Sequence, residues 1–400
     1  MHTRYRGLVG AIALLLGWSS GTLAAQQAGG DIPTNPFTRP TGPYRVGTLD
    51  WLWIDPARPE RYTKDPNDKR HLPVQVWYPA DSAPGGEPAP YVRVPEEFGP
   101  QSAFKSMEQV KTNAVTGAPV AKGQRKYPVL IYSHGAGWSR FTATFLTEEL
   151  ASHGYVIFSI DHPGLDRTVL FSDGTPFKAD TLSMPPQDPK DPRAGATKSM
   201  EFLNAVAFPI WLEDSRFVLD EVEKLNRAPG PFQDRLDLDR IGMLGWSFGG
   251  ATAIEMIRTD PRVKAAVNHD GRLFGGVMTE PTRRPFMLFH HGIDDAALAP
   301  EANRPMMREM MAGMRSTDST ARAGAGGDWY DVTIARTNHG SFSDLLLFRK
   351  QDTTLVAPRR AHEIISAYTL AFFDRYLKGH KSPLLKRAAP EFPEVAFRRK

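Results

Sequence analysis

The sequence of 400 residues contains no cysteine. This absence excludes a disulfide framework, a thiolate nucleophile and a lipidated cysteine behind an export signal. Clustered charge of one sign is also scarce, because 49 Lys and Arg residues are balanced by 45 Asp and Glu residues, which leaves a formal net charge of +4. The short basic run Arg398-Arg399-Lys400 is interpreted as a solvated end of the chain. We therefore predict no nucleic acid partner.

A long apolar run occurs at the N-terminus, from Leu8 to Trp18. A basic segment precedes it, and the small residues of Thr22-Leu23-Ala24-Ala25 follow it. This three-part pattern is typical of a cleaved signal peptide covering residues 1–25, and the apolar run is too short to span a bilayer comfortably. We expect an exported protein, periplasmic or secreted, with no membrane span after cleavage.

The rest of the chain is predicted to form one domain. Residues 26–43 are rich in Gly, Pro and Thr and are predicted to be a linker, whereas residues 44–400 show no internal repeat and no further domain-scale linker. Residues 80–124, dense in Pro, Gly, Ala and Glu, are predicted to be a long surface loop. Residues 165–193 carry many Pro, Asp and Gly, and their length indicates a lid or binding loop.

Strands and helices alternate along this domain. Continuous apolar runs, which favour strands buried on both faces of a sheet, occur at 127–132, 155–160, 240–244, 263–268, 285–290 and 329–335. Helices are predicted at 142–152, 197–226, 249–257, 302–314 and 359–377, and two extended segments at 44–54 and 72–78. The alternation predicts an α/β fold with a mostly parallel central sheet and helices on both faces.

The run Gly245-Trp246-Ser247-Phe248-Gly249 organises this pattern. It fits G-x-S-x-G and lies between a predicted strand and a predicted helix, where a tight turn lifts the serine hydroxyl above the sheet. Glycines on both sides leave room for the strand and the helix to approach each other. Ser247 is therefore the predicted nucleophile.

A serine hydroxyl is a poor nucleophile at neutral pH and needs a base, which in turn needs an orienting acid. His339 comes directly after the last predicted strand and is the predicted base. Asp270 ends the strand after the nucleophile helix, and Asp294 and Asp295 end the next strand. The order of residues along the chain slightly favours the second pair and leaves the choice of acid open.

A tetrahedral intermediate at Ser247 requires two backbone N–H donors. We expect one from Phe248, directly after the nucleophile, and one from Ala136 in the turn His134-Gly135-Ala136. His134 itself is predicted to shape that turn.

His290, His291 and Asp294 also suggest a metal site. Adjacent strand residues point to opposite faces of a sheet, however, so the two histidines are not expected to converge on one ion. We predict no metal and no cofactor.

Together these residues resemble the plasma-type (isoform II) platelet-activating factor acetylhydrolase family, a branch of the α/β hydrolases. The similarity covers most of residues 72–377 and is strongest at 132–137, 150–155, 247–252 and 339–344. In that family the acid follows the strand after the nucleophile helix, which corresponds to Asp270 and favours it over Asp294 and Asp295. Trp246 departs from the family, which often has histidine there.

The resemblance implies an α/β-hydrolase fold and a calcium-independent serine esterase for small-molecule or lipid esters with short or oxidised acyl chains, similar to a 1-alkyl-2-acetylglycerophosphocholine esterase. Related branches act on other esters: the polyester hydrolases, and the dienelactone hydrolases, which usually have the cysteine nucleophile that this chain lacks. A serine peptidase on the same fold and an inactive binding protein on a hydrolase scaffold are further alternatives.

Bulky rings flank the predicted nucleophile and oxyanion turn. Trp138, Trp246 and Phe248 are expected to fill much of an acyl pocket, and overpacking such a pocket is costly. This predicts a preference for acyl chains of about two to four carbons. The alternative is that the rings belong to the core and point away from the pocket.

Overall fold

The computed structural model describes residues 33–82, 85–92, 107–165, 169–170, 176–177, 182, 184–185, 191–280, 282–299 and 301–400. The predicted signal peptide and residues 26–32 of the predicted linker lie outside the described residues. Within these ranges, no helix is long and apolar enough to cross a membrane.

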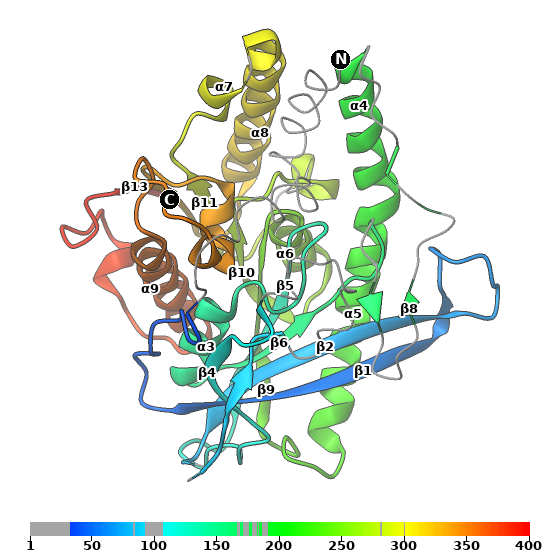
Figure 1. Cartoon of the computed structure of the whole chain (residues 1–400), viewed down its shortest axis with the longest axis vertical. Coiled ribbons are helices and arrows are strands. Elements are labelled where there is room, and N and C mark those ends of the chain that lie inside the picture. The colour runs from blue at the N-terminus through cyan, green and yellow to red at the C-terminus, as the bar shows by residue number, and fades with distance from the viewer. Residues whose placement is uncertain are drawn as a thin grey trace.

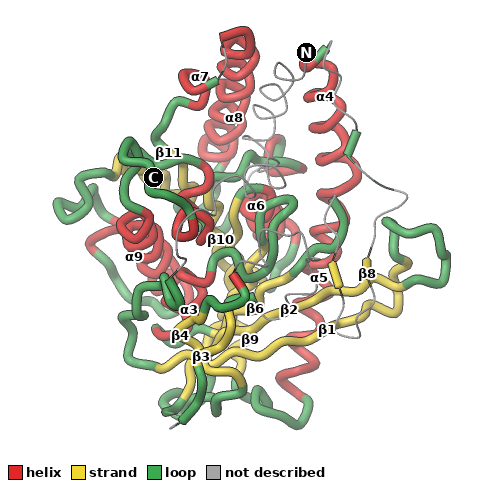
Figure 2. The backbone as a smooth tube through the Cα atoms, in the orientation of Figure 1, coloured by secondary structure: helices red, strands yellow, loops and turns green. Residues whose placement is uncertain are grey.

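A sheet of eleven strands runs through the described part of the molecule (Figures 1 and 2), in the order β13-β12-β11-β10-β9-β5-β6-β2-β1-β4-β3. Its strands are β1 (Arg45–Pro59), β2 (Lys69–Ala80), β3 (Pro88–Pro90), β4 (Lys111–Thr116), β5 (Tyr127–Ser133), β6 (Val156–Ile160), β9 (Leu236–Trp246), β10 (Val263–His269), β11 (Phe286–His291), β12 (Trp329–Ile334) and β13 (Val395–Arg399). From β6 to β12 every neighbouring pair is parallel. β2 and β13 flank this block in the antiparallel direction. The predicted mostly parallel sheet is confirmed.

Helices cover both faces of the sheet because successive side chains of a buried strand point to opposite sides. In β5, Leu130 and Tyr132 join the core beneath α3 (Thr144–Ser152) and α9 (Pro358–Leu377). Val129 and Ile131 join the core beneath α5 (Phe208–Arg227) and α6 (Phe248–Thr259), where Ala321 of α8 (Arg304–Gly324) also packs. The apolar layers on both faces of the sheet therefore hold the strands in place, and the candidate site lies at the ends of these strands.

The long helix predicted at 197–226 is interrupted. α4 (Pro192–Phe202) passes through one π-helical turn, η3 (Leu203–Ala207), into α5. Pro209 in the first turn of α5 explains the interruption, because proline has no N–H to donate and its ring displaces the carbonyl one turn earlier.

Of two predictions about segments at the edges of the sheet, one is wrong and one is incomplete. Residues 80–124 are not simply a surface loop, because β3 and β4 lie there and Tyr91, Val110 and Ala114 are buried in the core. Arg398, Arg399 and Lys400 are exposed, as expected of a solvated end, but β13 also pairs with β12 and Arg398 Nη2 lies 3.0 Å from Asp331 Oδ2. β3, β4 and β13 are too short and too polar to show the alternation typical of a strand. They form because they pair with a neighbouring strand of the sheet.

Other predicted segments are described in part. Residues 33–43 of the predicted linker contact the domain, since Phe37 is buried and the Thr41 N–H donates to Glu149. Most of the predicted lid, 165–193, lies outside the described residues; its described parts include β7 (Val169–Leu170) and β8 (Pro176–Phe177). The remaining short elements are η4 (Gly275–Met278), α7 (Asp295–Leu298), η5 (Glu301–Asn303), η6 (His339–Phe342), η7 (Asp344–Phe348) and η8 (Pro383–Leu385).

Candidate active site

Ser247 occupies the turn between β9 and α6. Its φ of 56° and ψ of −122° lie outside the regions that L-residues favour, as in a strained strand-to-helix turn. The close approach depends on Gly249, where an added Cβ would lie 2.0 Å from the carbonyl oxygen of Ser133. The Ser247 N–H is fixed by a 2.8 Å hydrogen bond to the carbonyl of His269.

His339 and Asp270 meet beside this turn. β12 delivers His339 to the start of η6, and β10 delivers Asp270, whose φ is 60°. The distance from His339 Nδ1 to Asp270 Oδ2 is 2.7 Å. His339 Nε2 is buried and has no hydrogen-bond partner in the described part of the chain. The imidazole is therefore oriented by the carboxylate through Nδ1, and its other nitrogen is unoccupied.

A second histidine, His291 at the end of β11, also contacts Asp270. Its backbone N–H donates to Asp270 Oδ1 at 3.0 Å, and its Nδ1 lies 2.7 Å from Oδ2. Burial by itself opposes ionisation, but His291 and the hydrogen bonds from both histidines hold the pKa of Asp270 well below its usual range. Burial alone would lower the pKa of His291 by disfavouring its charged form, but Asp270 and Asp295 raise that pKa well above the usual value. The sequence carried no signal for this contact beyond a histidine at a strand end.

The two other candidate acids have different partners. Asp294 accepts a hydrogen bond from the Ala296 N–H at 3.1 Å and so caps α7. Asp295 Oδ2 lies 3.0 Å from His291 Nε2. Of the three carboxylates proposed from sequence, Asp270 is the one that the structure brings to His339.

Asp270, His291 and His339 are also the residues that could hold a metal ion, since one ligand atom of each lies within 4.8 Å of the others. Nδ1 of each histidine also lies 2.7 Å from the same carboxylate oxygen, Asp270 Oδ2. A metal ion bound through these nitrogens would have to displace the protons that the two hydrogen bonds require. His290 does not join this group, because its ring faces Asp331 and Asp318 at 3.6 and 3.9 Å.

The two predicted N–H donors open onto a small cavity. It has a volume of about 30 Å³ and is lined by Ala136, Met200, Leu203, Ser247, Phe248, Arg272, Phe274, Met310 and Met314. Among the backbone hydrogen bonds of the described residues, neither the Ala136 N–H nor the Phe248 N–H has an acceptor. Two unused donors thus border the same space as the Ser247 side chain.

A second Ser-His-Asp arrangement lies behind the oxyanion turn. Ser133 Oγ is 2.9 Å from His162 Nε2, and His162 Nδ1 is 2.9 Å from Asp214 Oδ2. All three residues are at most 2% exposed, and Asp214 is also paired with Arg70 at 2.7 Å. No substrate can reach a serine that is 0% exposed, so this arrangement is structural.

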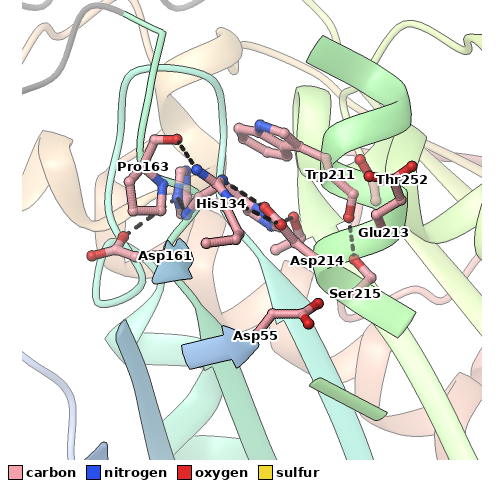
Figure 3. A network of polar contacts seen from close by, with 12 residues as sticks. Asp55, His134, Asp161, Pro163, Trp211, Glu213, Asp214, Ser215 and Thr252 are labelled. Carbon is pink, nitrogen blue, oxygen red and sulfur yellow. Dashed lines mark hydrogen bonds and ion pairs between the residues drawn. The ribbon is translucent and has the colours of Figure 1, made fainter. Parts of the chain in front are cut away.

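This buried network supports the predicted role of His134. Its Nδ1 lies 2.7 Å from the Gly135 carbonyl, and its Nε2 accepts a hydrogen bond from the His162 N–H at 3.1 Å. Trp211 stacks on His162, and Figure 3 shows His134, Trp211 and Asp214 together. Both ring nitrogens of His134 therefore have hydrogen-bond partners within and behind the turn that carries Ala136.

The bulky rings are divided between pocket and core. Phe248 lines the cavity at Ser247, but Trp138 and Trp246 do not; their rings pack against each other in the core. The prediction that all three rings fill the acyl pocket is therefore wrong for the two tryptophans. Trp246 has another contact instead, a 3.0 Å hydrogen bond from Nε1 to the carbonyl of His339. It fixes the loop that carries the histidine.

Comparisons with known proteins agree with the fold. A family model described as platelet-activating factor acetylhydrolase, isoform II, matches residues 34–172, and one described as alpha/beta hydrolase family matches residues 129–394. A probable 1-alkyl-2-acetylglycerophosphocholine esterase of Arthroderma benhamiae is 24% identical over 285 residues, which are 68% of this chain and 66% of that protein. The platelet-activating factor acetylhydrolase of Cavia porcellus is 24% identical over 256 residues, 58% of this chain and 55% of that protein. The match thus spans less than two thirds of either relative.

One solved structure is similar over a larger share of its length. The ferulic acid esterase from Streptomyces cinnamoneus is 29% identical, covers 91% of this chain and 99% of its own, and superposes with a TM-score of 0.66. The predicted fold and the resemblance stated from the sequence are both confirmed by these matches.

Proposed function

The chain belongs to the α/β hydrolase family, and on that premise we propose that it is an exported serine carboxylic-ester hydrolase, periplasmic or secreted, with Ser247, His339 and Asp270 as its triad. The observation that carries the proposal is the His339–Asp270 pair at 2.7 Å, with His339 Nε2 unoccupied and the His339 ring 5.2 Å from that of Trp246, the residue before the strained Ser247. A nucleophile, a base and an orienting acid are thereby supplied from three separate strand ends.

The chemistry follows from these positions. His339 Nε2 takes the Ser247 proton as Oγ attacks the ester carbonyl, and the N–H groups of Ala136 and Phe248 bind the resulting oxyanion. His339 then gives the proton to the departing alcohol, which leaves an acyl-serine. Water attacks the acyl-serine with His339 again as base, and the free acid and the serine hydroxyl are restored. Asp270 holds the imidazole in the tautomer with hydrogen on Nδ1.

The acyl group is short in this proposal. The cavity beside Ser247 has a volume of about 30 Å³ and is bounded by Leu203, Phe248 and Phe274, so it favours a small acyl group over a long one. Esters of two to four acyl carbons are the expected substrates, and 2-acetyl phospholipids are candidates because the curated relatives are named for that activity. Dienelactones and polyester fragments are the alternative ester classes.

Active-site labelling tests the proposal. A fluorophosphonate probe should label the wild-type protein and Ser133→Ala but not Ser247→Ala, and Ser247→Ala should lower p-nitrophenyl acetate turnover by a factor on the order of 10^4. Ser133→Ala is the matched control, because it removes a serine from the other Ser-His-Asp arrangement and should cost about 1–3 kcal/mol of stability by leaving His162 Nε2 without its partner. A wild-type protein that takes no label is an inactive scaffold.

A panel of esters then tests the substrate. Turnover should be highest for p-nitrophenyl esters of about two to four acyl carbons and should fall toward sixteen, because longer chains clash with the rings around the cavity. A 2-acetyl phospholipid, a dienelactone and a polyester fragment complete the panel. An optimum at twelve or more carbons contradicts the short-acyl proposal and indicates a lipase.

A further inference from the structure

A wider groove adjoins the cavity at Ser247. It has a volume of about 560 Å³ and shares Met200, Arg272, Phe274 and Met310 with the small cavity. Its walls come from α4 and α8, which Figure 1 shows at the same end of the molecule, and an ion pair between Arg193 and Glu309 joins the two helices at 2.5 Å. The small cavity and the groove therefore form one bent site, with Ser247 at its narrow end.

Most of the groove lining is apolar and adaptable. Met200, Met278, Met306 and Met310 contribute flexible thioether side chains that fit apolar groups of varied shape. An exposed carboxylate, Glu201, lies on the same lining, and the other carboxylate, Glu309, is paired with Arg193. The groove thus favours an amphiphilic ligand, and its remaining cation is Arg272.

Arg272 is half-buried at the junction of the groove and the cavity. Within the described ranges it donates no hydrogen bond and forms no ion pair. Burial lowers the pKa of its guanidinium, and Asp318 is the one anion that acts against this effect. A partly desolvated guanidinium with no partner is costly, because its five N–H donors have lost water without gaining acceptors.

The position of Arg272 is fixed by the catalytic loop. It follows Asp270 and Gly271, and the Asn268 side chain clamps this turn through hydrogen bonds of 2.7 and 2.8 Å to the Gly271 N–H and carbonyl. An added Cβ at Gly271 would lie 1.9 Å from the Ser247 carbonyl oxygen, so the loop packs directly on the nucleophile turn. The Nη2 atom reaches α8, where a Cβ at Gly313 would lie 3.9 Å away. The backbone of Arg272 is therefore held next to the nucleophile turn, and its side chain lines the same cavity as Ser247.

We infer that Arg272 is a specificity-determining residue that binds an anionic group, a carboxylate or a phosphate, on the alcohol half of the ester substrate. The inference rests on the proposed function, with the short acyl group in the cavity and the alcohol half along the methionine-lined groove. Arginine suits this role because its planar fork binds carboxylate and phosphate oxygens through two hydrogen bonds. The unpaired guanidinium then gains in the complex the acceptors that it lacks in the free protein.

Matched esters test this inference. The assay follows acid release from 6-acetoxyhexanoate, 4-acetoxybutyl phosphate and neutral hexyl acetate, with the wild type, Arg272→Gln, Arg272→Lys and Arg193→Gln. The wild type should prefer one or both anionic esters in kcat/KM, and Arg272→Gln should lower the anionic-to-neutral ratio about tenfold or more, since charged hydrogen bonds are among the stronger ones. Arg272→Lys should retain part of the ratio. Arg193→Gln removes a cation from the same groove that already has a partner, so its ratio should stay within about twofold.

The two anionic esters distinguish a carboxylate site from a phosphate site. Equal ratios in the wild type and in Arg272→Gln overturn the inference while leaving the esterase proposal intact. Absence of turnover for all three esters overturns the esterase proposal instead. In that case calorimetric titration with hexanoate and butyl phosphate still decides the inference, because binding should occur in the wild type and Arg193→Gln and be lost in Arg272→Gln.

Discussion

Replacing Asp270 by asparagine should cripple turnover while leaving a folded protein. Asp270 accepts three hydrogen bonds, one from His339 and two from His291. An amide offers one acceptor oxygen where the carboxylate has two, so His339 is presented with a donor or left in the wrong tautomer. The corresponding change in a serine protease triad lowers kcat about 10^4-fold, or roughly 5.5 kcal/mol at 1.36 kcal/mol for each tenfold change.

The free energy of unfolding of Asp270→Asn should fall by less than the roughly 5.5 kcal/mol that the variant loses in catalysis. Breaking a buried ion pair typically costs about 3–5 kcal/mol because one charge is left without a partner. Here His291 keeps Asp295 at 3.0 Å from its Nε2, and one hydrogen bond to the amide oxygen survives. We therefore expect a loss of about 1–3 kcal/mol, at the lower end of that range or below it.

The assay compares kcat for p-nitrophenyl acetate with urea unfolding for Asp270→Asn, Asp294→Asn and Asp295→Asn. Asp294→Asn should remove only a helix cap, and Asp295→Asn should act only through His291, so each should keep kcat within about tenfold of the wild type. If Asp294→Asn or Asp295→Asn is the crippled variant and Asp270→Asn turns over normally, the assignment of the acid is refuted.

The remaining predictions concern charge and stability. The pKa of His291 is raised in the folded protein, so the stabilisation that its cation provides is complete below the unfolded pKa of about 6.5 and is lost as the pH rises toward the folded pKa. The free energy of unfolding, measured with urea between pH 6 and 9, should therefore fall more steeply with pH for the wild type than for His291→Asn. Equal slopes contradict this prediction. Asp214→Asn leaves the buried His162 without a carboxylate and leaves Arg70 with Glu60 at 3.0 Å, and it should cost about 3–5 kcal/mol of stability with fluorophosphonate labelling per folded molecule retained. Loss of labelling in protein that remains folded would assign this network to the chemistry. Dialysis against EDTA should leave turnover unchanged, since the proposed mechanism uses no metal, and activity that is lost on chelation and restored by a divalent ion would place the site in another class.

Local patterns in the sequence were sufficient for the layers of the fold and for proposing two of the three residues of the candidate site. Apolar runs identified the parallel strands because a strand buried on both faces has no polar side to show. The glycines around Ser247 identified the turn because backbone atoms approach too closely there for a Cβ. His339 was found by its place after the last parallel strand. The interruption between α4 and α5 and the pairing of β13 were missed, because a π turn and an edge strand depend on neighbours that a local pattern does not contain.

The partners of the charged groups were decided only by the tertiary structure. Asp270, Asp294 and Asp295 all follow parallel strands whose ends meet at one edge of the sheet, so the sequence alone could not choose among them. The choice depends on the positive φ of Asp270, which turns its carboxylate toward both His291 and His339. Access to a cavity separates Ser247, which is 7% exposed and lines the small cavity, from Ser133, which has the same residue types around it but is 0% exposed. The lack of an ion-pair partner for Arg272 among the described residues likewise depends on how α4 and α8 pack around it. The energy of a charged group is determined by the groups that surround it in three dimensions.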